Sequence, residues 1–251
     1  MAKYKNNMFD CRMKYYDSVF KTGTIKYLDQ NNIRSLAYYK FENNLFDSSG
    51  NGYDASLIYG SPTLSYAPGI IGECAVFSYT HAAIYVPSLS NYFEAINAYS
   101  IVIWFKTTQT TNGTLFATTQ IGTGGTELWL AVNNNHVEWH RYIDSARAVG
   151  TLNSYSDDSW HLAVAQFTGA QLILNIDGGT EIITTDDARS AHGSSKVVFG
   201  EDGATSRKYT GSMDEIQIID RSLSNNEILS IYNNSFGAKN GNIKYYDSSW
   251  K

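Results

Sequence analysis

Apolar and polar residues alternate in short segments between residues 36 and 220, with the two-residue period of strands that bury one face. Segments rich in Gly, Asn and Ser separate them, as turns separate strands. Strands at this spacing, without intervening helices, are typical of an antiparallel β-sandwich. The predicted strands are residues 36–42, 73–78, 82–87, 100–107, 113–122, 127–132, 136–143, 159–167, 171–179, 181–185, 196–200 and 212–220.

The segment 127–142 predicts a hairpin whose register follows from its apolar side chains. A two-residue turn at Asn134-Asn135 gathers them on one face, whereas a slip of one residue would place Leu130 opposite Glu138. We therefore predict the first register. Its exposed face carries the pairs Ala131–Glu138, Trp129–His140 and Glu127–Tyr142.

One short helix is predicted near the end of the body. Ser224 and Glu227 form an S-x-x-E capping box, in which each side chain accepts a hydrogen bond from the backbone N–H of the other residue. An apolar stripe runs from Ile228 to Tyr232, and Asn233-Asn234 is predicted to end the helix after two turns. A helix this short needs a sheet to pack against.

The composition agrees with a β-protein. The 251 residues are 14% aromatic and 17% charged, with 20 Gly and 3 Pro, which fits neither a helical bundle nor a disordered chain. No signal peptide is visible, and no apolar run approaches the roughly 18–20 residues that span a bilayer, so we expect no membrane partner. Cys11 and Cys74 allow two free thiols or one disulfide, but no CxxC metal site.

Charge is unevenly distributed along the chain. Residues 1–34 carry +4 and residues 236–251 carry +2, which leaves −11 for the body of a chain whose net charge is −5. Nucleic-acid binders present a dense basic face, so we expect no nucleic-acid partner. The basic ends are either solubilising tails or arms that contact an acidic partner.

Related phrases occur at both ends of the chain: MKYYDSVFK, TIKYLDQ and NIKYYDSSWK. Each alternates β-forming and polar residues and then meets a turn, as a short strand does. We predict an N-terminal arm at 1–35 and a C-terminal arm at 236–251, because disordered tails are poor in aromatics. Chance similarity in a tyrosine-rich chain is the alternative. The arms would pair with another chain around Tyr15, Tyr16, Tyr245 and Tyr246.

Four motifs follow one another in the body: LAYYKFENNLFDSSGNGYDAS, GIIGECAVFS with AAIYVP, SWHLAVAQFTGAQLILNIDGG, and YTGSMDEIQIIDRSLSNNEILSIY. In this order they resemble the laminin-G-like domains of the concanavalin A-like lectin/glucanase superfamily. The resemblance implies an all-β jelly roll of two curved antiparallel sheets, one of them concave, over residues 36–235. That superfamily includes lectins, enzymes and structural modules, so the fold by itself does not determine the function.

The same resemblance implies one structural Ca²⁺ between the D-x-S-G-N-G loop and the closing D-E strand. The corresponding residues are Asp47, Asn51 and Asp214, with backbone carbonyls around Gly50 to Gly52. A hard cation with about six to eight oxygen ligands suits such a loop. The alternative is that Asp47 caps its own turn and Asp214 accepts a backbone N–H.

The candidate ligand platform is the concave face of the predicted hairpin. Trp129, His140 and Tyr142 would stack on a sugar ring, while Glu127 and Glu138 accept hydrogen bonds from its hydroxyls. The alternative is that a loop or another subunit covers these aromatic side chains.

Catalysis is the less favoured interpretation of this fold. The β-glucanases that share it carry E-x-D-x-x-E on one strand, and no such string occurs here. Glu138 and Asp144 lie six positions apart without a third acid between them, and His161 belongs to a packing motif. We therefore predict no catalytic residues.

Three classes of function remain. We favour a non-catalytic surface module of a larger assembly, a decoration or adhesion protein at the surface of a virus or phage particle. The terminal phrases, which look like short segments of phage structural proteins, favour it, and other structural proteins would be its partners. The second class is a free glycan-binding lectin, and the third is an unusual glycosidase. A homo-oligomer is compatible with each class.

Overall fold

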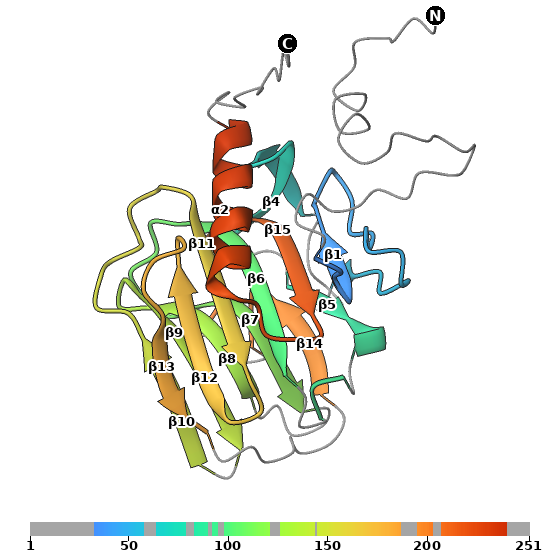
Figure 1. The fold of residues 1–251 in the computed structure, drawn as a ribbon. Helices are drawn as coiled ribbons and strands as arrows, with labels where there is room; N and C mark the ends of the chain where they lie inside the picture. The colour runs from blue at the N-terminus through green and yellow to red at the C-terminus, as the bar shows by residue number, and fades with distance from the viewer. Residues whose placement is uncertain are drawn as a thin grey trace, which may run out of the picture.

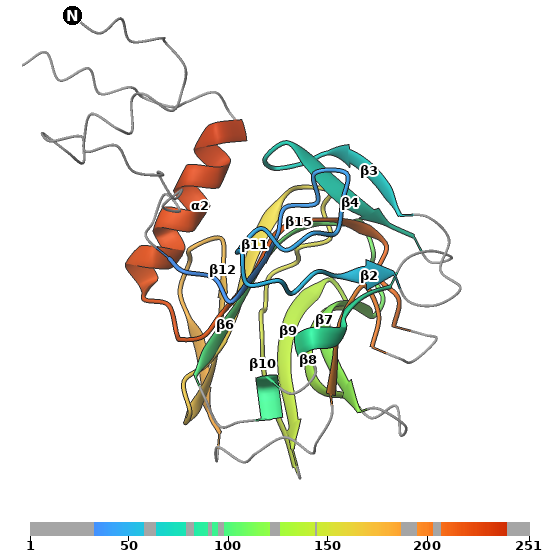
Figure 2. The ribbon, with the colours of Figure 1, turned by 90° about the vertical axis from the view of Figure 1, so that its right-hand side faces the viewer.

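The computed structural model describes residues 33–57, 64–78, 83–89, 92–94, 98–120, 126–143, 145–186, 195–202 and 207–239. These residues form two antiparallel sheets that lie face to face, with one helix outside them (Figure 1, Figure 2). The prediction of an all-β two-sheet jelly roll with a C-terminal helix is confirmed.

The first sheet has eight strands in the described part of the chain, and its centre is made by β6 and β15. Both β1 and β4 pair with the side of β15 that β6 leaves free, β1 at residues 216–218 and β4 at residues 211–213. The strands run in the order β13 (Ile182–Thr185), β12 (Gln171–Ile176), β11 (His161–Phe167), β6 (Tyr99–Lys106), β15 (Gly211–Ile219), β4 (Glu73–Phe77) and β3 (Ser65–Pro68), with β1 (Ala37–Tyr39) beside β15.

The second sheet has seven described strands, and four of them follow one another as a meander from β7 to β10. The neighbour of β7 on its other side is β14, which comes from much later in the chain. The pairing of β7 with β14 therefore joins segments that are far apart in the sequence. The order is β10 (Ser145–Gly150), β9 (His136–Ile143), β8 (Thr126–Asn133), β7 (Gly113–Gln120), β14 (Ser195–Phe199), β5 (Ile84–Val86) and β2 (Ser56–Leu57). Two short 3-10 helices, Pro87–Leu89 and Tyr92–Glu94, follow β5.

The main hydrophobic core lies between the two sheets. It contains the side chains that face inward, at every second position, from strands of both sheets. Trp139 of β9 and Phe105 of β6 are examples, and both are completely buried. The indole Nε1 of Trp139 donates to the backbone carbonyl of Gln166 on β11 over 3.1 Å, so the bulkiest core side chain also connects the sheets.

Helix α2 (Asn225–Lys239) covers the outer face of the eight-stranded sheet (Figure 2). The capping box is confirmed, because Ser224 N donates to Glu227 Oε2 over 2.8 Å and Glu227 N donates back to Ser224 Oγ. The predicted end at Asn233-Asn234 is wrong. Tyr232 stacks on Trp104 with ring centroids 5.7 Å apart, and the helix continues past the two asparagines to Lys239.

The predicted hairpin register is confirmed over the residues that pair. Val132 lies opposite Val137, Leu130 opposite Trp139, and Trp129 opposite His140. Asn134 and Asn135 both have positive φ, at 50° and 69°, which matches the right-handed twist of a two-residue hairpin turn.

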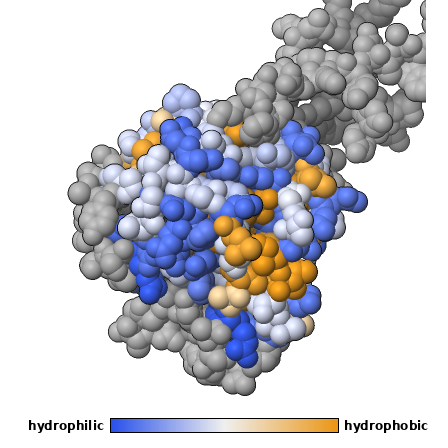
Figure 3. Space-filling model, turned by 90° about the vertical axis from the view of Figure 1, so that its left-hand side faces the viewer, coloured by the Kyte–Doolittle hydropathy of each residue, from blue (hydrophilic) through white to orange (hydrophobic). Residues whose placement is uncertain are grey.

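The side of the molecule where β13 ends the eight-stranded sheet carries an apolar patch within a hydrophilic surface (Figure 3). Ile183 of β13 is 48% exposed and pairs with Ile173 of β12, and Leu229 of α2 is 40% exposed. Exposed large apolar side chains thus occur both on β13, at Ile183, and on α2, at Leu229.

The body begins earlier than the predicted boundary at residue 36. Ile33 is buried in the core beneath α2, and Ser35 Oγ donates to Gln217 Oε1 over 3.0 Å. The arm residues Tyr15, Tyr16, Tyr245 and Tyr246 lie outside the described residues, as does Cys11. Cys74 is a free, buried thiol. Among the described residues, no helix is long and apolar enough to span a membrane.

Candidate functional site

The hairpin of β8 and β9 positions the candidate ligand platform on the outer face of the seven-stranded sheet. Trp129 and His140 are directly paired, and their rings lie 5.0 Å apart at 48°. The register continues through the whole sheet, so one residue from each strand falls in a single row. The row reads Ala148, His140, Trp129, Ala117, Val198, Tyr85 and Ser56.

Trp129 does not present an open ring. The residue is only 3% exposed, and its indole Nε1 donates to Thr114 Oγ1 over 2.9 Å. The guanidinium of Arg207 lies over the ring, 4.8 Å from its centroid, and is held there by Asp202 at 2.8 Å. The chain itself therefore covers this aromatic side chain, and the expected stacking of Trp129 on a sugar is not available in this conformation.

Sequence reasoning missed Arg207 for a physical reason. It lies far along the chain from Trp129, in a loop between β14 and β15, and nothing in its local sequence distinguishes it from a solvated loop cation. The placement of β14 beside β7 brings Arg207 over Trp129 of β8.

The polar part of the platform is a connected cluster on β8 and β9. The carboxylate of Glu138 accepts hydrogen bonds at Oε2 from Asn133 Nδ2 over 3.0 Å and from His140 Nε2 over 2.8 Å. Both Glu138 and His140 are half-buried. Across the sheet they pair with Gly150 and Ala148 of β10, which are both exposed. Both partners are small, so they place little side-chain bulk beside the cluster on the β10 side.

For the two remaining platform residues, the structure describes the strand but not the side chain. Glu127 lies in β8 and Tyr142 in β9, but their side chains lie outside the described part of the structure. Of the five predicted platform residues, the structure brings together Trp129, His140 and Glu138.

Asp47 is the centre of the loop that follows β1. Its Oδ1 accepts from the backbone N–H groups of Tyr38 and Ser49, and its Oδ2 accepts from Ser49 Oγ and Tyr53 N. Burial alone would raise the pKa of Asp47, but these hydrogen bonds outweigh it and lower the pKa. Four donors use the roughly four lone-pair sites of a carboxylate, which is the turn-capping arrangement.

Asp214 is fully buried on β15 and contacts a different loop. Its Oδ2 accepts from Ile70 N and Ile71 N, and its Oδ1 accepts from Glu215 N. Burial, followed by the charge of Glu215, raises the pKa of Asp214 to about 8. Gly69 makes room for this carboxylate, because a side chain there would collide with Oδ2.

Asn51 completes the predicted calcium set, and its side chain also has structural partners. Its Nδ2 donates to the carbonyls of Ser35 and Leu36, over 3.2 Å and 2.9 Å. Each of the three predicted ligands thus has partners of its own. Among the described residues, no group of three or more His, Cys, Asp or Glu side chains is close enough to hold a metal ion. The calcium site stays a prediction.

His161 lies on β11 between two carboxylates. Its Nδ1 is 2.7 Å from Asp177 Oδ2, and its Nε2 is 3.1 Å from Asp157 Oδ1. Burial would lower the pKa of His161, but the hydrogen bonds and charges of the two aspartates outweigh it and raise the pKa. The ring also lies 5.0 Å from that of Tyr155. This packed, ion-paired position agrees with the structural role predicted for His161.

Comparison with known protein families finds the concanavalin A-like lectin/glucanases superfamily, matched by residues 78–229. A comparison with curated protein sequences finds no match.

Many solved structures share the fold. One is domain 4 of AbnA, a GH43 extracellular arabinanase from Geobacillus stearothermophilus, in complex with arabinotriose. It is 20% identical with a TM-score of 0.67, and the alignment covers 79% of this chain and 98% of that one. Another is the binding domain of botulinum neurotoxin DC in complex with SialylT, 11% identical with a TM-score of 0.63, over 82% of this chain and 52% of that one.

The binding domain of Paraclostridial Mosquitocidal Protein 1 is also similar, at 11% identity and a TM-score of 0.63, over 82% of this chain and 53% of that one. The chain thus spans about half the length of the two toxin binding domains. At these identities the likeness concerns the fold. The family match, however, covers more than half of the chain, and the protein belongs to the concanavalin A-like lectin/glucanases superfamily.

Proposed function

We propose that this protein is a non-catalytic carbohydrate-binding module. The observation that carries the proposal is the cluster of Glu138, His140 and Asn133, which is hydrogen-bonded, half-buried and bordered by the exposed Gly150 and Ala148 of β10. A fixed carboxylate beside an imidazole and an amide offers acceptors and donors to sugar hydroxyls, and small neighbours leave room for the ring.

Two structural neighbours support the ligand class. The arabinanase domain was solved with arabinotriose and the neurotoxin binding domain with SialylT. Carbohydrate ligands therefore occur among proteins that share this fold.

The described side chains of this face favour a binding role over hydrolysis. Retaining and inverting glycosidases both need two carboxyl groups at a defined separation across the sugar bond. Among the described side chains on the outward face of β7, β8, β9 and β14, Glu138 is the one carboxylate, and it is engaged by Asn133 and His140. The glycosidase alternative would require release of reducing sugar from a polysaccharide, lost in Glu138→Gln.

The test is binding of arabinotriose and of neutral and sialylated oligosaccharides, measured by glycan array and calorimetry. A lost hydrogen bond to a charged group costs roughly 10- to 100-fold in affinity, so Glu138→Gln and His140→Ala should weaken binding by about that factor. Ala148→Trp should block it by filling the space beside His140. Glu181→Gln, a half-buried glutamate next to β13 in the other sheet, is the matched control and should bind normally.

If none of these saccharides binds, or if the two β9 variants bind as tightly as the wild type, the proposed site is wrong. A wild-type protein that binds only as part of its assembly would favour the surface module over a free lectin.

We further propose that the module belongs to a larger assembly, such as a virion, and joins it through the arms. The support is the tyrosine-rich phrases at both ends and their positive charge, opposite in sign to that of the body. A suitable truncation removes residues 1–32 and keeps Ile33, because Ile33 packs in the core. The truncated protein should then fold, and should melt at the same temperature as the full chain, but should fail to join the assembly. Normal incorporation of the truncated protein would make a free lectin the better interpretation.

A further inference from the structure

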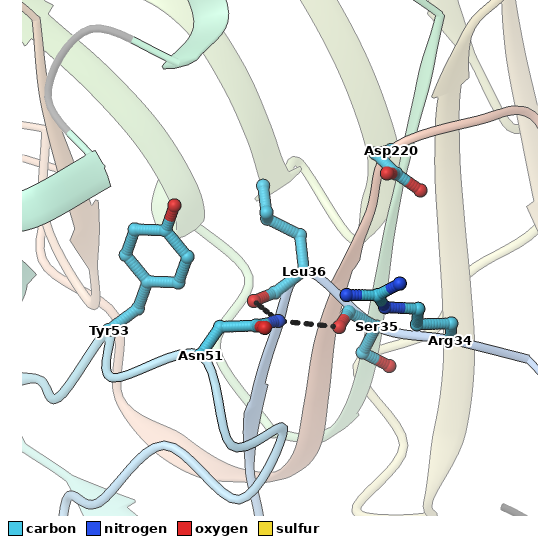
Figure 4. A pocket seen from close by; sticks show the side chains of 6 residues that line it. All are labelled: Arg34, Ser35, Leu36, Asn51, Tyr53 and Asp220. Atoms are coloured by element: carbon cyan, nitrogen blue, oxygen red, sulfur yellow. Dashed lines mark hydrogen bonds between the residues drawn. The ribbon is translucent and has the colours of Figure 1, made fainter.

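A polar pocket lies away from the β8–β9 platform, where the chain enters β1 and leaves β15. Its volume is about 290 Å³, close to the lower end of the range for small-molecule sites. Figure 4 shows the side chains that line it, which are Arg34, Ser35, Leu36, Asn51, Tyr53 and Asp220.

The wall of this pocket is held by hydrogen bonds from three segments. Asn51 Nδ2 donates to the carbonyls of Ser35 and Leu36, as the dashed lines in Figure 4 mark. The backbone N–H of Tyr53 donates to Asp47, and the carbonyl of Tyr53 accepts from Tyr39 Oη over 2.7 Å. This wall is therefore fixed before any ligand arrives, which reduces the entropy lost on binding.

Unlike the groups that form the wall, three polar groups that face the pocket have no hydrogen-bond partner among the described residues. Within the described part of the chain, the structure gives no hydrogen bond or ion pair to the guanidinium of Arg34, the carboxylate of Asp220 or the hydroxyl of Tyr53. In Figure 4, Arg34 and Asp220 lie on the side of the pocket opposite the Tyr53 ring. The pocket thus offers a donor-only group, an acceptor-only group and an aromatic ring at once.

We propose that this pocket binds one residue of a neutral saccharide. A ligand with net charge would be attracted by one of Arg34 and Asp220 and repelled by the other. A hydroxyl group both donates and accepts, so neighbouring sugar hydroxyls can accept from Arg34 and donate to Asp220 together. The Tyr53 ring suits the apolar face of a sugar ring. The ligand class rests on the proposed carbohydrate-binding function, whereas the site is separate from the one proposed there.

The test is nuclear magnetic resonance of the labelled full chain, titrated with arabinotriose, maltotriose and cellotriose. At least one of these should shift the backbone amide signals of residues 34–36, 51–53 and 220 in a saturable manner. Arg34→Gln and Asp220→Asn should each weaken this binding by roughly tenfold or more. Lys40→Gln, which removes an exposed cation outside the pocket, is the control and should leave the binding unchanged. Glu138→Gln should also leave the response of these pocket signals to the saccharide unchanged.

Each other outcome has a definite meaning. If saccharide binding is lost in Glu138→Gln but unchanged in both pocket variants, the pocket inference fails and the proposed function stands. Loss only in the pocket variants supports the pocket and overturns the β9 site. Pocket signals that respond to glycine or to glucuronate, but to no neutral sugar, overturn the ligand assignment. No response of the pocket signals to any of the three saccharides overturns the pocket inference, and the absence of binding of any neutral or sialylated saccharide to the protein overturns both proposals.

Discussion

The guanidinium of Arg207 lies over the indole ring of Trp129, with its central carbon 4.8 Å from the ring centroid. This contact joins the β14–β15 loop to the middle of the seven-stranded sheet. It removes from solvent the aromatic ring that the sequence suggested for sugar stacking.

Removing that contact should uncover Trp129. In the double variant Arg207→Ala/Asp202→Asn, which avoids leaving the Asp202 charge buried without its partner, we expect greater quenching of tryptophan fluorescence by acrylamide. The cost in stability should exceed the about 0.5–1 kcal/mol of an exposed cation–π contact, because the variant also removes the ion pair to the buried Asp202. Adding Trp129→Phe should abolish the gain in quenching. Equal quenching of wild type and double variant would mean that other groups cover the ring.

Arg141 and Asp186 form a buried ion pair between the sheets. Their atoms are 3.1 Å apart and both side chains are 3% exposed, while the guanidinium also lies over the Phe167 ring. Arg141→Met should lower the free energy of unfolding by about 3–5 kcal/mol, because it leaves a buried carboxylate without its partner. Urea unfolding measures this change.

Two controls separate burial from charge in that experiment. The double variant Arg141→Met/Asp186→Leu should lose less stability than the single variant, since no buried charge remains. Lys106→Met disrupts the more exposed pair with Asp158, 3.4 Å apart, and should cost less than about 1 kcal/mol. A single variant as stable as the wild type would contradict the assigned role of the pair.

His161 should make stability depend on pH. Its pKa in the folded protein is raised above the ordinary 6.5, so the folded state binds more protons than the unfolded state in the interval between the two values. The stabilisation is therefore complete below about pH 6.5 and is lost as the pH rises through the folded pKa. Melting temperatures from about pH 5.5 to about pH 9 should show this decrease in the wild type.

The same melting series in variants identifies the group responsible. His161→Gln should lack this part of the decrease, and Asp177→Asn should reduce it strongly. Asp157→Asn should reduce it less, because Asp157 is the more exposed partner. Parallel curves for wild type and His161→Gln would rule out His161 as the cause.

Calcium binding by Asp47, Asn51 and Asp214 remains a proposal with a direct test. A calcium ion bound to the folded state would stabilise it, so a chelator should lower the melting temperature, and Asp214→Asn should remove that sensitivity. Identical melting with and without chelator would leave the hydrogen-bonded turn around Asp47 as the complete description.

Local signals predicted many of the elements correctly. The hairpin turn at Asn134-Asn135 was predictable because its backbone needs positive φ, which asparagine tolerates, and because one register alone buries Leu130 and Trp139 together. The start of α2 was predictable because Ser224 and Glu227 satisfy each other's backbone N–H groups. Its end was not, because asparagine only moderately disfavours a helix, and α2 continues past Asn233 and Asn234 to Lys239.

The sequence by itself therefore determined the fold class, the hairpin register and the residues that share its outer face, since each depends on side chains a few positions apart. Tertiary structure decided which of those residues are accessible. Arg207 covers Trp129 because β14 pairs with β7, and the Arg34–Asp220 pocket exists because β1 pairs with β15. Neither contact leaves a local pattern, because pairing between distant strands depends on how the whole core packs, not on the residues next to each position.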